Sequence, residues 1–501
     1  MKKIRYISLI LCLLLLLQTG MLPVGATGAT DATDSSSATD ATEETVSGTI
    51  TLPSTVGTTP IASGCRTIDG QNPLGGSQRM LSTAQSAFVY EVNTSTILYA
   101  YNPDVRVAPG SLSKMLTALI AIEECDLDDV ITVSTREISQ LPYGSLVVDL
   151  MEGEQVTLRD VLHCLLLASG NDAALVVAEH VTGNEISFVE KMNKRLETLG
   201  CTNTYLTNCH GLDNPQQYTT ARDIAKITLA CYQNPIFAEI IKTKTYTVEA
   251  NNRRKEPMTV ETGNHLIYER NLPQFNDDRV TGGMPSYVSV ASGASIAFTA
   301  SENNMDIVFV IMGATRTYED NGWKAARYGN FEEALDLLDF AFSGYRIHRL
   351  LYRDQPLNQF PVNGGECNVV AGSETYLDSV VPISAKMDNM LIRYSLKNGG
   401  LNAPIADGEQ IGVVQIWYDT SCLAEAEIYA MGEVRAKGNT GVEIYGLERV
   451  SSGVSGFLSV LGMLLLGVVV LAALYLAVNN YRRYRARMRR RRRRASRRRS
   501  R

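Results

Sequence analysis

The chain has 501 residues and a formal net charge of −6, a length that excludes a single small domain and predicts two or three domains with separate cores. Fourteen arginines follow Val478, and acidic residues outnumber basic ones over the rest of the chain, which argues against nucleic-acid binding by the body of the protein. The nine cysteines include no C-x-x-C pair, which excludes a dense disulfide scaffold and a zinc ribbon.

Both ends of the chain have the patterns of membrane-targeting segments. Residues 1–26 combine three basic residues, a long apolar run and small residues suited to cleavage, which predicts a secretory signal peptide. Residues 457–478 carry no charge over a length that can cross a bilayer, and the arginine-rich residues 479–501 follow directly. We therefore predict a single-pass protein of the cell membrane, with an extracellular body, a transmembrane helix at 457–478 and a short cytoplasmic tail at 479–501.

Between the signal peptide and the first regular pattern, residues 27–78 are predicted to form a low-complexity linker rich in Ala, Thr, Asp and Ser. Two runs rich in Val, Ile, Tyr and Phe then flank the letters "NTST", which predicts a β-hairpin. The next segment, "APGSLSKMLTALIA", has helical spacing, because its apolar residues fall on one face. Those residues are Leu112, Met115, Leu116, Leu119 and Ile120.

The following segments predict a run of helices and then, beyond Lys242, a run of strands. Thr157 is a candidate N-cap for the helix "LRDVLHCLLLA", and helices are predicted at "DAALVVAEHV", "SFVEKMNKRLETLG" and "TARDIAKITLACY". Beyond Lys242 come predicted strands at "TKTYTVEA", "ASIAFTAS" and "MDIVFVIMGAT", and then a last helix. Residues 79–345 are therefore predicted to be one α+β domain with an antiparallel sheet packed by helices. Residues 346–450, with short alternating runs between turns, are predicted to be a small β-rich domain.

Ser111 and Lys114 stand three positions apart at the start of the first predicted helix. This spacing places both side chains on one helix face, about 5–6 Å apart at Cβ. Serine is a poor nucleophile without a base, and a lysine can serve as that base only if burial or a cationic neighbour lowers its pKa. The pair alone is equally compatible with a helix N-cap beside a solvated lysine.

A polar break between two apolar helices strengthens the catalytic interpretation. The letters "SGN" place Ser169 and Asn171 in a tight turn, where both side chains can point into one cleft. Ser169 could relay a proton and Asn171 could hold a substrate amide. An ordinary helix–helix turn built from Ser, Gly and Asn is the alternative.

These motifs and their order resemble those of the serine-type D-alanyl-D-alanine carboxypeptidases, the low-molecular-mass penicillin-binding proteins. The blocks that carry the resemblance are "APGSLSKMLTALIA", "LLLASGNDAALVVAEHV" and the segment around "TNCHGLDNPQQYTTARDIA", and it extends to "LNAPIADGEQIGVVQIW". The resemblance implies a β-lactamase/transpeptidase-like fold followed by a β-rich domain. It also implies Ser111 as acyl-enzyme nucleophile, Lys114 as its base, and Ser169 with Asn171 as the second element of the site. The expected partners are peptidoglycan stem peptides and β-lactam antibiotics, with no metal or other cofactor.

One block departs from this family's pattern, which has a K-T-G motif on a strand beside the cleft. Here the corresponding stretch reads "VTGGMPSY". Met284-Pro285-Ser286 takes the place of K-T-G in one alignment, and Val280 takes the lysine position in another. Either way the cation expected to attract the substrate's carboxylate is missing, and Arg279 is a candidate to supply a charge from nearby.

The departure leaves two functions open. The first is a working D-Ala-D-Ala carboxypeptidase that removes the terminal D-alanine of stem peptides, and the alternative is a catalytically impaired member that binds wall peptides or partners without efficient turnover. A β-lactamase fits less well, because neither the β-rich domain nor a membrane tether is expected there. The five histidines show no metal-ligand spacing, and His163 and His180 are interpreted as structural residues within apolar helices.

Overall fold

The structure, a computed structural model, describes residues 54–56, 67–71, 73–76, 80–270, 272–287, 289, 292–318 and 325–438. The predicted signal peptide, transmembrane helix and arginine-rich tail lie outside these residues, as does most of the predicted linker. Among the helices of the described residues, none is both long enough and apolar enough to span a membrane.

The centre of the first domain is a five-stranded antiparallel sheet with the order β3-β2-β10-β9-β8. Its strands are β2 (Ser86–Glu91), β3 (Thr96–Tyr101), β8 (Val280–Tyr287), β9 (Ala294–Glu302) and β10 (Met305–Ala314). The hairpin predicted around "NTST" is confirmed as the antiparallel pair β2–β3, and the predicted strands in the last third of the domain are β9 and β10. Strand β8 lies at the sheet edge, where a proline is tolerated because no outer neighbour needs its missing N–H.

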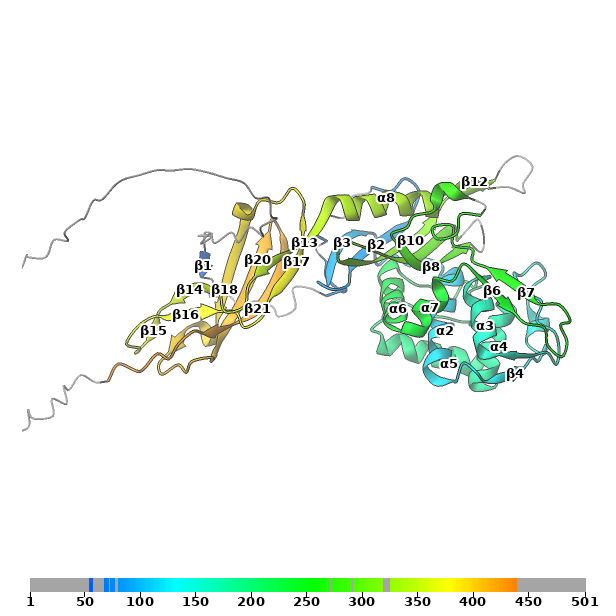
Figure 1. Cartoon of the computed structure of the whole chain (residues 1–501), viewed down its shortest axis with the longest axis horizontal. Helices are drawn as coiled ribbons and strands as arrows, with labels where there is room; N and C mark the ends of the chain where they lie inside the picture. The colour runs from blue at the N-terminus through cyan, green and yellow to red at the C-terminus, as the bar shows by residue number, and fades with distance from the viewer. Residues whose placement is uncertain are drawn as a thin grey trace, which may run out of the picture. The chain divides into compact units, whose positions relative to one another are not determined.

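Helices cover both faces of this sheet (Figure 1). One face packs against a helical layer made of α2 (Ser113–Glu124), α3 (Leu158–Leu166), α4 (Asn171–Thr182), α5 (Glu185–Thr198), α6 (Ala221–Gln233) and α7 (Pro235–Ile241). The other face packs against α8 (Gly329–Gly344). Alternation along β10 explains the division, because Val310 joins the first core while its neighbours Phe309 and Ile311 join the second. The predicted α+β architecture is therefore confirmed.

Local signals fix where the helices begin. Thr157 forms a capping box with Asp160 at the start of α3, as predicted, and Asn184, Thr220 and Asn234 cap α5, α6 and α7 with their side chains. Three short ribbons decorate the domain: β4 (Val130–Thr132) with β5 (Gln155–Thr157), β6 (Thr245–Val248) with β7 (Met258–Glu261), and β11 (Arg316–Tyr318) with β12 (Ala325–Tyr328). The predicted strand "TKTYTVEA" is thus part of a separate ribbon and not of the central sheet.

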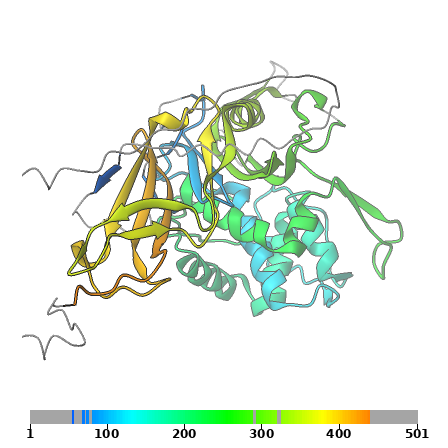
Figure 2. The ribbon, with the colours of Figure 1, turned by 60° about the vertical axis from the view of Figure 1, so that its left-hand side comes forward.

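The second domain is β-rich, as predicted, and has a hydrophobic core of its own. Its main sheet has the order β1-β18-β20-β21-β16-β14, and the yellow-to-orange strands of this sheet are seen together in Figure 2. The bounds are β1 (Ser54–Val56), β14 (Pro356–Phe360), β16 (Val369–Gly372), β18 (Met390–Leu396), β20 (Gln410–Tyr418) and β21 (Ser421–Ala430). Two smaller pairs complete it: β13 (Tyr345–Leu351) with β17 (Leu377–Pro382), and β15 (Val362–Asn363) with β19 (Leu401–Asn402).

Candidate active site

Ser111 lies in a single 3-10 turn, Gly110–Leu112, that leads directly into α2. Gly110 adopts φ +54°, a left-handed conformation that glycine reaches without a Cβ penalty. The loop around Gly211 crosses this turn so closely that a Cβ on Gly211 would lie 2.0 Å from the carbonyl oxygen of Gly110. Two glycines therefore allow the backbone of a distant loop to pack over the serine, whose exposed fraction is 9%.

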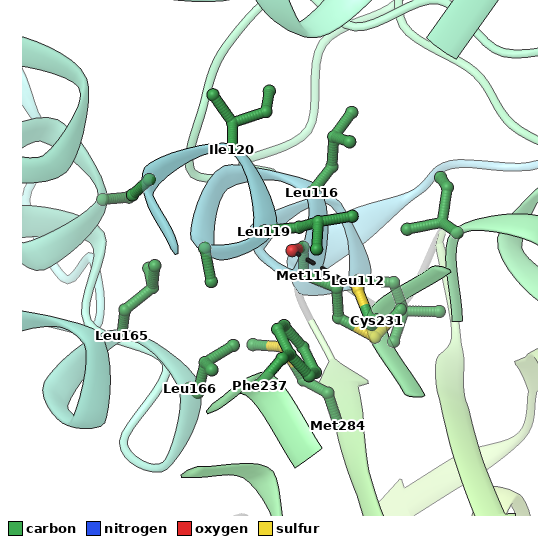
Figure 3. Packing of buried hydrophobic residues seen from close by; sticks show 14 of the residues in the cluster. Leu112, Met115, Leu116, Leu119, Ile120, Leu165, Leu166, Cys231, Phe237 and Met284 are labelled. Atoms are coloured by element: carbon green, nitrogen blue, oxygen red, sulfur yellow. Dashed lines mark hydrogen bonds between the residues drawn. The ribbon is translucent and has the colours of Figure 1, made fainter. Parts of the chain in front are cut away.

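Lys114 is buried at the centre of the site, with an exposed fraction of 1%. Its Nζ lies 3.3 Å from Ser111 Oγ and 2.8 Å from Asn171 Oδ1, and it also donates to the backbone carbonyl of His210. Apolar residues of the same helix, including Met115 and Leu119, pack against α3 and α7 (Figure 3). The burial that the sequence suggested for Lys114 is thus confirmed.

Burial also sets the protonation of this lysine. Loss of water around the ammonium lowers the pKa of Lys114 from its usual 10.5 to about 7, against smaller opposing effects of Cys209 and Asp172. At neutral pH a large fraction of Lys114 is therefore the neutral amine. A neutral amine has two N–H donors and one lone pair, so when Asn171 Oδ1 and the His210 carbonyl take both donors, the lone pair faces the Ser111 hydroxyl.

The predicted "SGN" turn joins α3 to α4 beside this cluster. Asn171 is the first residue of α4, almost fully buried, and its backbone N–H donates to the carbonyl of Leu146. Ser169 adopts φ +56°, which is rare for a residue other than glycine and is typical of constrained functional turns. Within the described residues the Ser169 hydroxyl makes no hydrogen bond to Ser111 or Lys114, so its role in proton relay stays a prediction.

Two further ionisable residues, Asp172 and His210, lie close to Lys114. Asp172 accepts backbone N–H groups of Val148, Leu150 and Ala173, yet burial raises its pKa overall. Burial, with a smaller effect of the nearby Lys114, lowers the pKa of His210 to about 4. His210 is therefore neutral at physiological pH and serves the site through its backbone carbonyl.

Strand β8 lies on the other side of the Ser111 site. Its position shows which of the two alignments of the missing K-T-G motif is correct. Ser286 Oγ accepts a hydrogen bond of 2.8 Å from the backbone N–H of Ser111, which places Met284-Pro285-Ser286 beside the serine. Met284 is fully buried and packs with Phe237 and Leu166 (Figure 3), so an apolar side chain occupies the lysine position. The backbone N–H of a serine nucleophile commonly donates a hydrogen bond to the oxyanion. Here the Ser111 N–H already donates to the Ser286 hydroxyl.

The hypothesis that Arg279 supplies the missing charge is wrong. Its guanidinium is held 2.7 Å from a carboxylate oxygen of Asp277 and 2.8 Å from one of Asp339. Those hydrogen bonds raise the pKa of Arg279 and neutralise its charge locally. A guanidinium already engaged by two carboxylates does not attract a third.

Arg316 is a cation that sequence reasoning missed. It lies at the start of β11 with its guanidinium over the ring of Tyr287, the residue that follows Ser286, at 4.6 Å from the ring centre. It also faces the rings of Tyr318 and Tyr328, and in the described part of the chain it forms no ion pair. Buried nitrogens of Arg316 (Nε) and His265 (Nδ1) lack a hydrogen-bond partner there. The charge of Arg316 also adds to burial in lowering the pKa of His265.

Cys209 lies close enough to Lys114 to have a weak effect on its pKa. Cys201 and Cys209, which are close in sequence, are both buried free thiols and do not pair, and burial raises the pKa of both. His163, interpreted as structural from the sequence, stacks on Tyr246 and bonds to the carbonyl of Arg159.

Comparison with known proteins identifies the fold and the family. The sequence profile of the D-alanyl-D-alanine carboxypeptidases matches residues 76–316, and that of the penicillin-binding protein 5 C-terminal domain matches residues 345–436. D-alanyl-D-alanine carboxypeptidase DacA of Haemophilus influenzae is 30% identical over 366 residues, which make up 72% of this chain and 87% of the relative. The chain belongs to the D-alanyl-D-alanine carboxypeptidase family. The resemblance inferred from the sequence motifs is confirmed.

Further D-alanyl-D-alanine carboxypeptidase relatives agree. DacF of Bacillus subtilis is 28% identical over 371 residues, covering 71% of this chain and 87% of the relative. The crystal structure of penicillin binding protein 5 from Haemophilus influenzae aligns with a TM-score of 0.56 at 28% identity, covering 72% of this chain and all of that one. The predicted transpeptidase-like domain followed by a β-rich domain is therefore confirmed.

Proposed function

We propose that the protein is a serine-type D-Ala-D-Ala carboxypeptidase that removes the terminal D-alanine of peptidoglycan stem peptides through an acyl-enzyme on Ser111. The observation that carries the proposal is the buried Lys114, whose Nζ donates to Asn171 Oδ1 and the His210 carbonyl and lies 3.3 Å from Ser111 Oγ. Family membership supports the substrate class. The intact contacts around Lys114 favour a working enzyme over the impaired alternative.

The chemistry follows from these contacts. Neutral Lys114 takes the Ser111 proton while Oγ attacks the carbonyl carbon of the penultimate D-alanine, and the new oxyanion accepts the Ser111 N–H. The resulting ammonium returns the proton to the departing nitrogen as the peptide C–N bond breaks and free D-alanine leaves. A water molecule, deprotonated in the same way, then hydrolyses the ester and restores Ser111. Asn171 orients the base, and its side-chain nitrogen is proposed to donate to a substrate carbonyl.

The function is tested by D-alanine release from a pentapeptide that ends in D-Ala-D-Ala, measured with the purified chain. Labelled penicillin tests the same nucleophile, because a β-lactam acylates the serine that attacks the peptide. We expect both D-alanine and a covalent penicillin adduct. A chain that yields neither would be the impaired family member.

We further propose that Arg316 binds the substrate's terminal carboxylate in place of the absent K-T-G lysine, since it lies beside strand β8 and has no ion-pair partner among the described residues. Arg316→Leu is expected to lower kcat/KM by about 10- to 100-fold, the value of one charge-assisted contact. The readout is specific: the preference of the enzyme for a free carboxylate over a C-terminally amidated peptide should disappear in the variant.

Arg279→Leu is the matched control for this variant, because Arg279 is an arginine of the same domain that two carboxylates already engage. It should retain the preference for the free carboxylate. If Arg316→Leu keeps that preference, or if Arg279→Leu loses it equally, the assignment to Arg316 fails.

Ser286 is expected to slow acylation, because its hydroxyl must leave the Ser111 N–H before an oxyanion can take that position. A neutral hydrogen bond is worth about 0.5–1.5 kcal/mol, so Ser286→Ala is expected to increase the rate of penicillin acylation by about 2- to 10-fold. Ser286→Thr keeps a hydroxyl and should stay near the parent rate. An unchanged or slower rate in Ser286→Ala would show that the hydroxyl does not compete with the oxyanion.

We propose that the chain acts outside the cell, as a single-pass membrane protein anchored near its C-terminus. The support is the pattern of residues 1–26 and the uncharged stretch 457–478 with arginines after it. The domain limits are proposed as 79–345 for the catalytic domain and 346–450 for the β-rich domain. The predicted linker at 27–78 needs a correction, because Ser54–Val56 forms strand β1 and pairs with β18 of the β-rich domain. This location brings the site to its polymeric substrate.

A further inference from the structure

We propose that the catalytic domain carries a second site, formed by Cys125, Asp129 and His180, which binds a divalent transition metal of the zinc type. None of these residues takes part in the chemistry assigned to Ser111, so the inference is independent of the proposed function. The spacing of the three residues along the chain matches no metal motif, and His180 alone suggested a structural role. Only the fold brings them together.

The ligand atoms are already close to a coordination geometry. The sulfur, a carboxylate oxygen and an imidazole nitrogen all lie within 4.8 Å of one another, and His180 Nε2 is 3.2 Å from Asp129 Oδ2. Zinc bonds of about 2.0–2.1 Å at tetrahedral angles place such a nitrogen and oxygen about 3.3 Å apart. The thiolate, with a bond of about 2.3 Å, belongs about 3.6 Å from each, and the Cys125 sulfur already lies within 4.8 Å of both atoms.

Backbone hydrogen bonds hold these ligands in place. Cys125 ends α2, and its N–H donates to the carbonyl of Ala121. The carbonyl of Asp129 accepts the N–H of Leu158, which fastens the loop to the start of α3. His180 lies in the last turn of α4, which packs beside α2. A metal therefore meets a largely preformed site and does not need to order a flexible loop.

The chemistry of the set suits zinc better than a hard cation. Thiolate and imidazole are ligands of Zn²⁺, whereas Mg²⁺ and Ca²⁺ prefer oxygen. The three residues are each half-buried, so an ion can enter from solvent. A polar cavity of about 300 Å³ reaches His180 and Glu179 and is lined by Thr132 and Ser134, which leaves room for water in a fourth position, as in sites with three protein ligands.

Neighbouring charges favour a cation. Glu179 lines the pocket, and the carboxylates of Asp129 and Glu124 both act on the Cys125 thiol, against the opposing charge of Lys191, which is bound to Glu124. The alternative is that Asp129 and His180 form an ordinary hydrogen bond with Cys125 as a bystander thiol. The two interpretations differ in one respect: only a metal site makes Cys125 reactivity depend on zinc.

The first experiment titrates the reduced full chain with Co²⁺, which reports a thiolate ligand by a near-ultraviolet charge-transfer band. We expect one equivalent to produce the band, Zn²⁺ to remove it, and Cys125→Ser and His180→Gln to abolish it. Cys367→Ser is the matched control, because Cys367 is an exposed free thiol away from the cluster, and it should keep the band. A parent chain without the band, or a band that survives in Cys125→Ser, overturns the proposal.

A second measurement uses the unaltered chain and does not depend on any variant folding. Maleimide labelling followed by peptide mapping compares Cys125 with Cys367 in the same molecules, with and without Zn²⁺. Zinc should protect Cys125 at least 10-fold and leave Cys367 unchanged, and chelation should reverse the protection. Equal labelling of Cys125 in both conditions contradicts the site, whereas penicillin acylation of the same sample reports separately on Ser111.

Discussion

Ser111→Ala is expected to lower D-alanine release by at least about 10⁴-fold and to abolish the covalent penicillin adduct. Loss of the nucleophile in a serine hydrolase removes nearly all the rate that the catalytic group provides and leaves only the contribution of binding and oxyanion contacts. The substitution removes one oxygen from a residue whose backbone N–H already bonds to Ser286, so the fold should be unaffected. D-alanine release and labelled penicillin measure both effects.

Ser113→Ala is the control for this result, since Ser113 lies on the same turn and its hydroxyl bonds only to the carbonyl of Gly110 in the described structure. It should retain the adduct. Equal D-alanine release by the parent chain and Ser111→Ala would refute the proposed mechanism.

Lys114→Met is expected to lower kcat/KM by about 10²- to 10⁴-fold, the usual contribution of a general base. Methionine fills a similar volume, so the apolar surroundings stay packed while the base is lost. In the parent chain the active form is the neutral amine, and burial sets the pKa of Lys114 at about 7. The value of kcat/KM should therefore rise as the pH increases through 7 and level off above it. In Lys114→Met this rising limb of the pH–rate profile should vanish.

Lys226→Met separates a catalytic role from the general effect of losing a buried lysine. Lys226 is also nearly buried, but its ammonium pairs with Asp69 and Asp223 and bonds to the carbonyl of Gly200. This variant can lose stability, yet its pH–rate profile should keep the limb near 7. A limb that persists in Lys114→Met assigns the base to another group.

Met284 leaves the site without the second cation of the family's motif. A lysine at that position would add a like charge near Lys114, whereas methionine extends the apolar wall formed with Phe237 and Leu166. The pKa of Lys114 is lowered by loss of hydration alone. Recognition of the substrate's carboxylate then needs a different cation, the role proposed for Arg316.

Much of the local structure was predictable from the sequence. The "NTST" hairpin, the Thr157 cap and the helical spacing around Ser111 and Lys114 depend on residues within a few positions of each other. Backbone geometry converts such patterns directly into strands, caps and shared helix faces. The order of the motifs was also enough to assign the family, because each motif is short and contiguous.

The chemistry of the site was decided by tertiary structure. Lys114 finds its acceptors at Asn171 and His210, and Ser111 meets Ser286, all far away in the sequence. The ion pair of Arg279 with the distant Asp339 has no local signal in the sequence. The same holds for Arg316, which has no ion-pair partner among the described residues. The sequence by itself determined which elements form and which family they belong to. Only the folded structure decided which charges are buried, paired or available, because desolvation and Coulomb interactions depend on distance in space and not on separation along the chain.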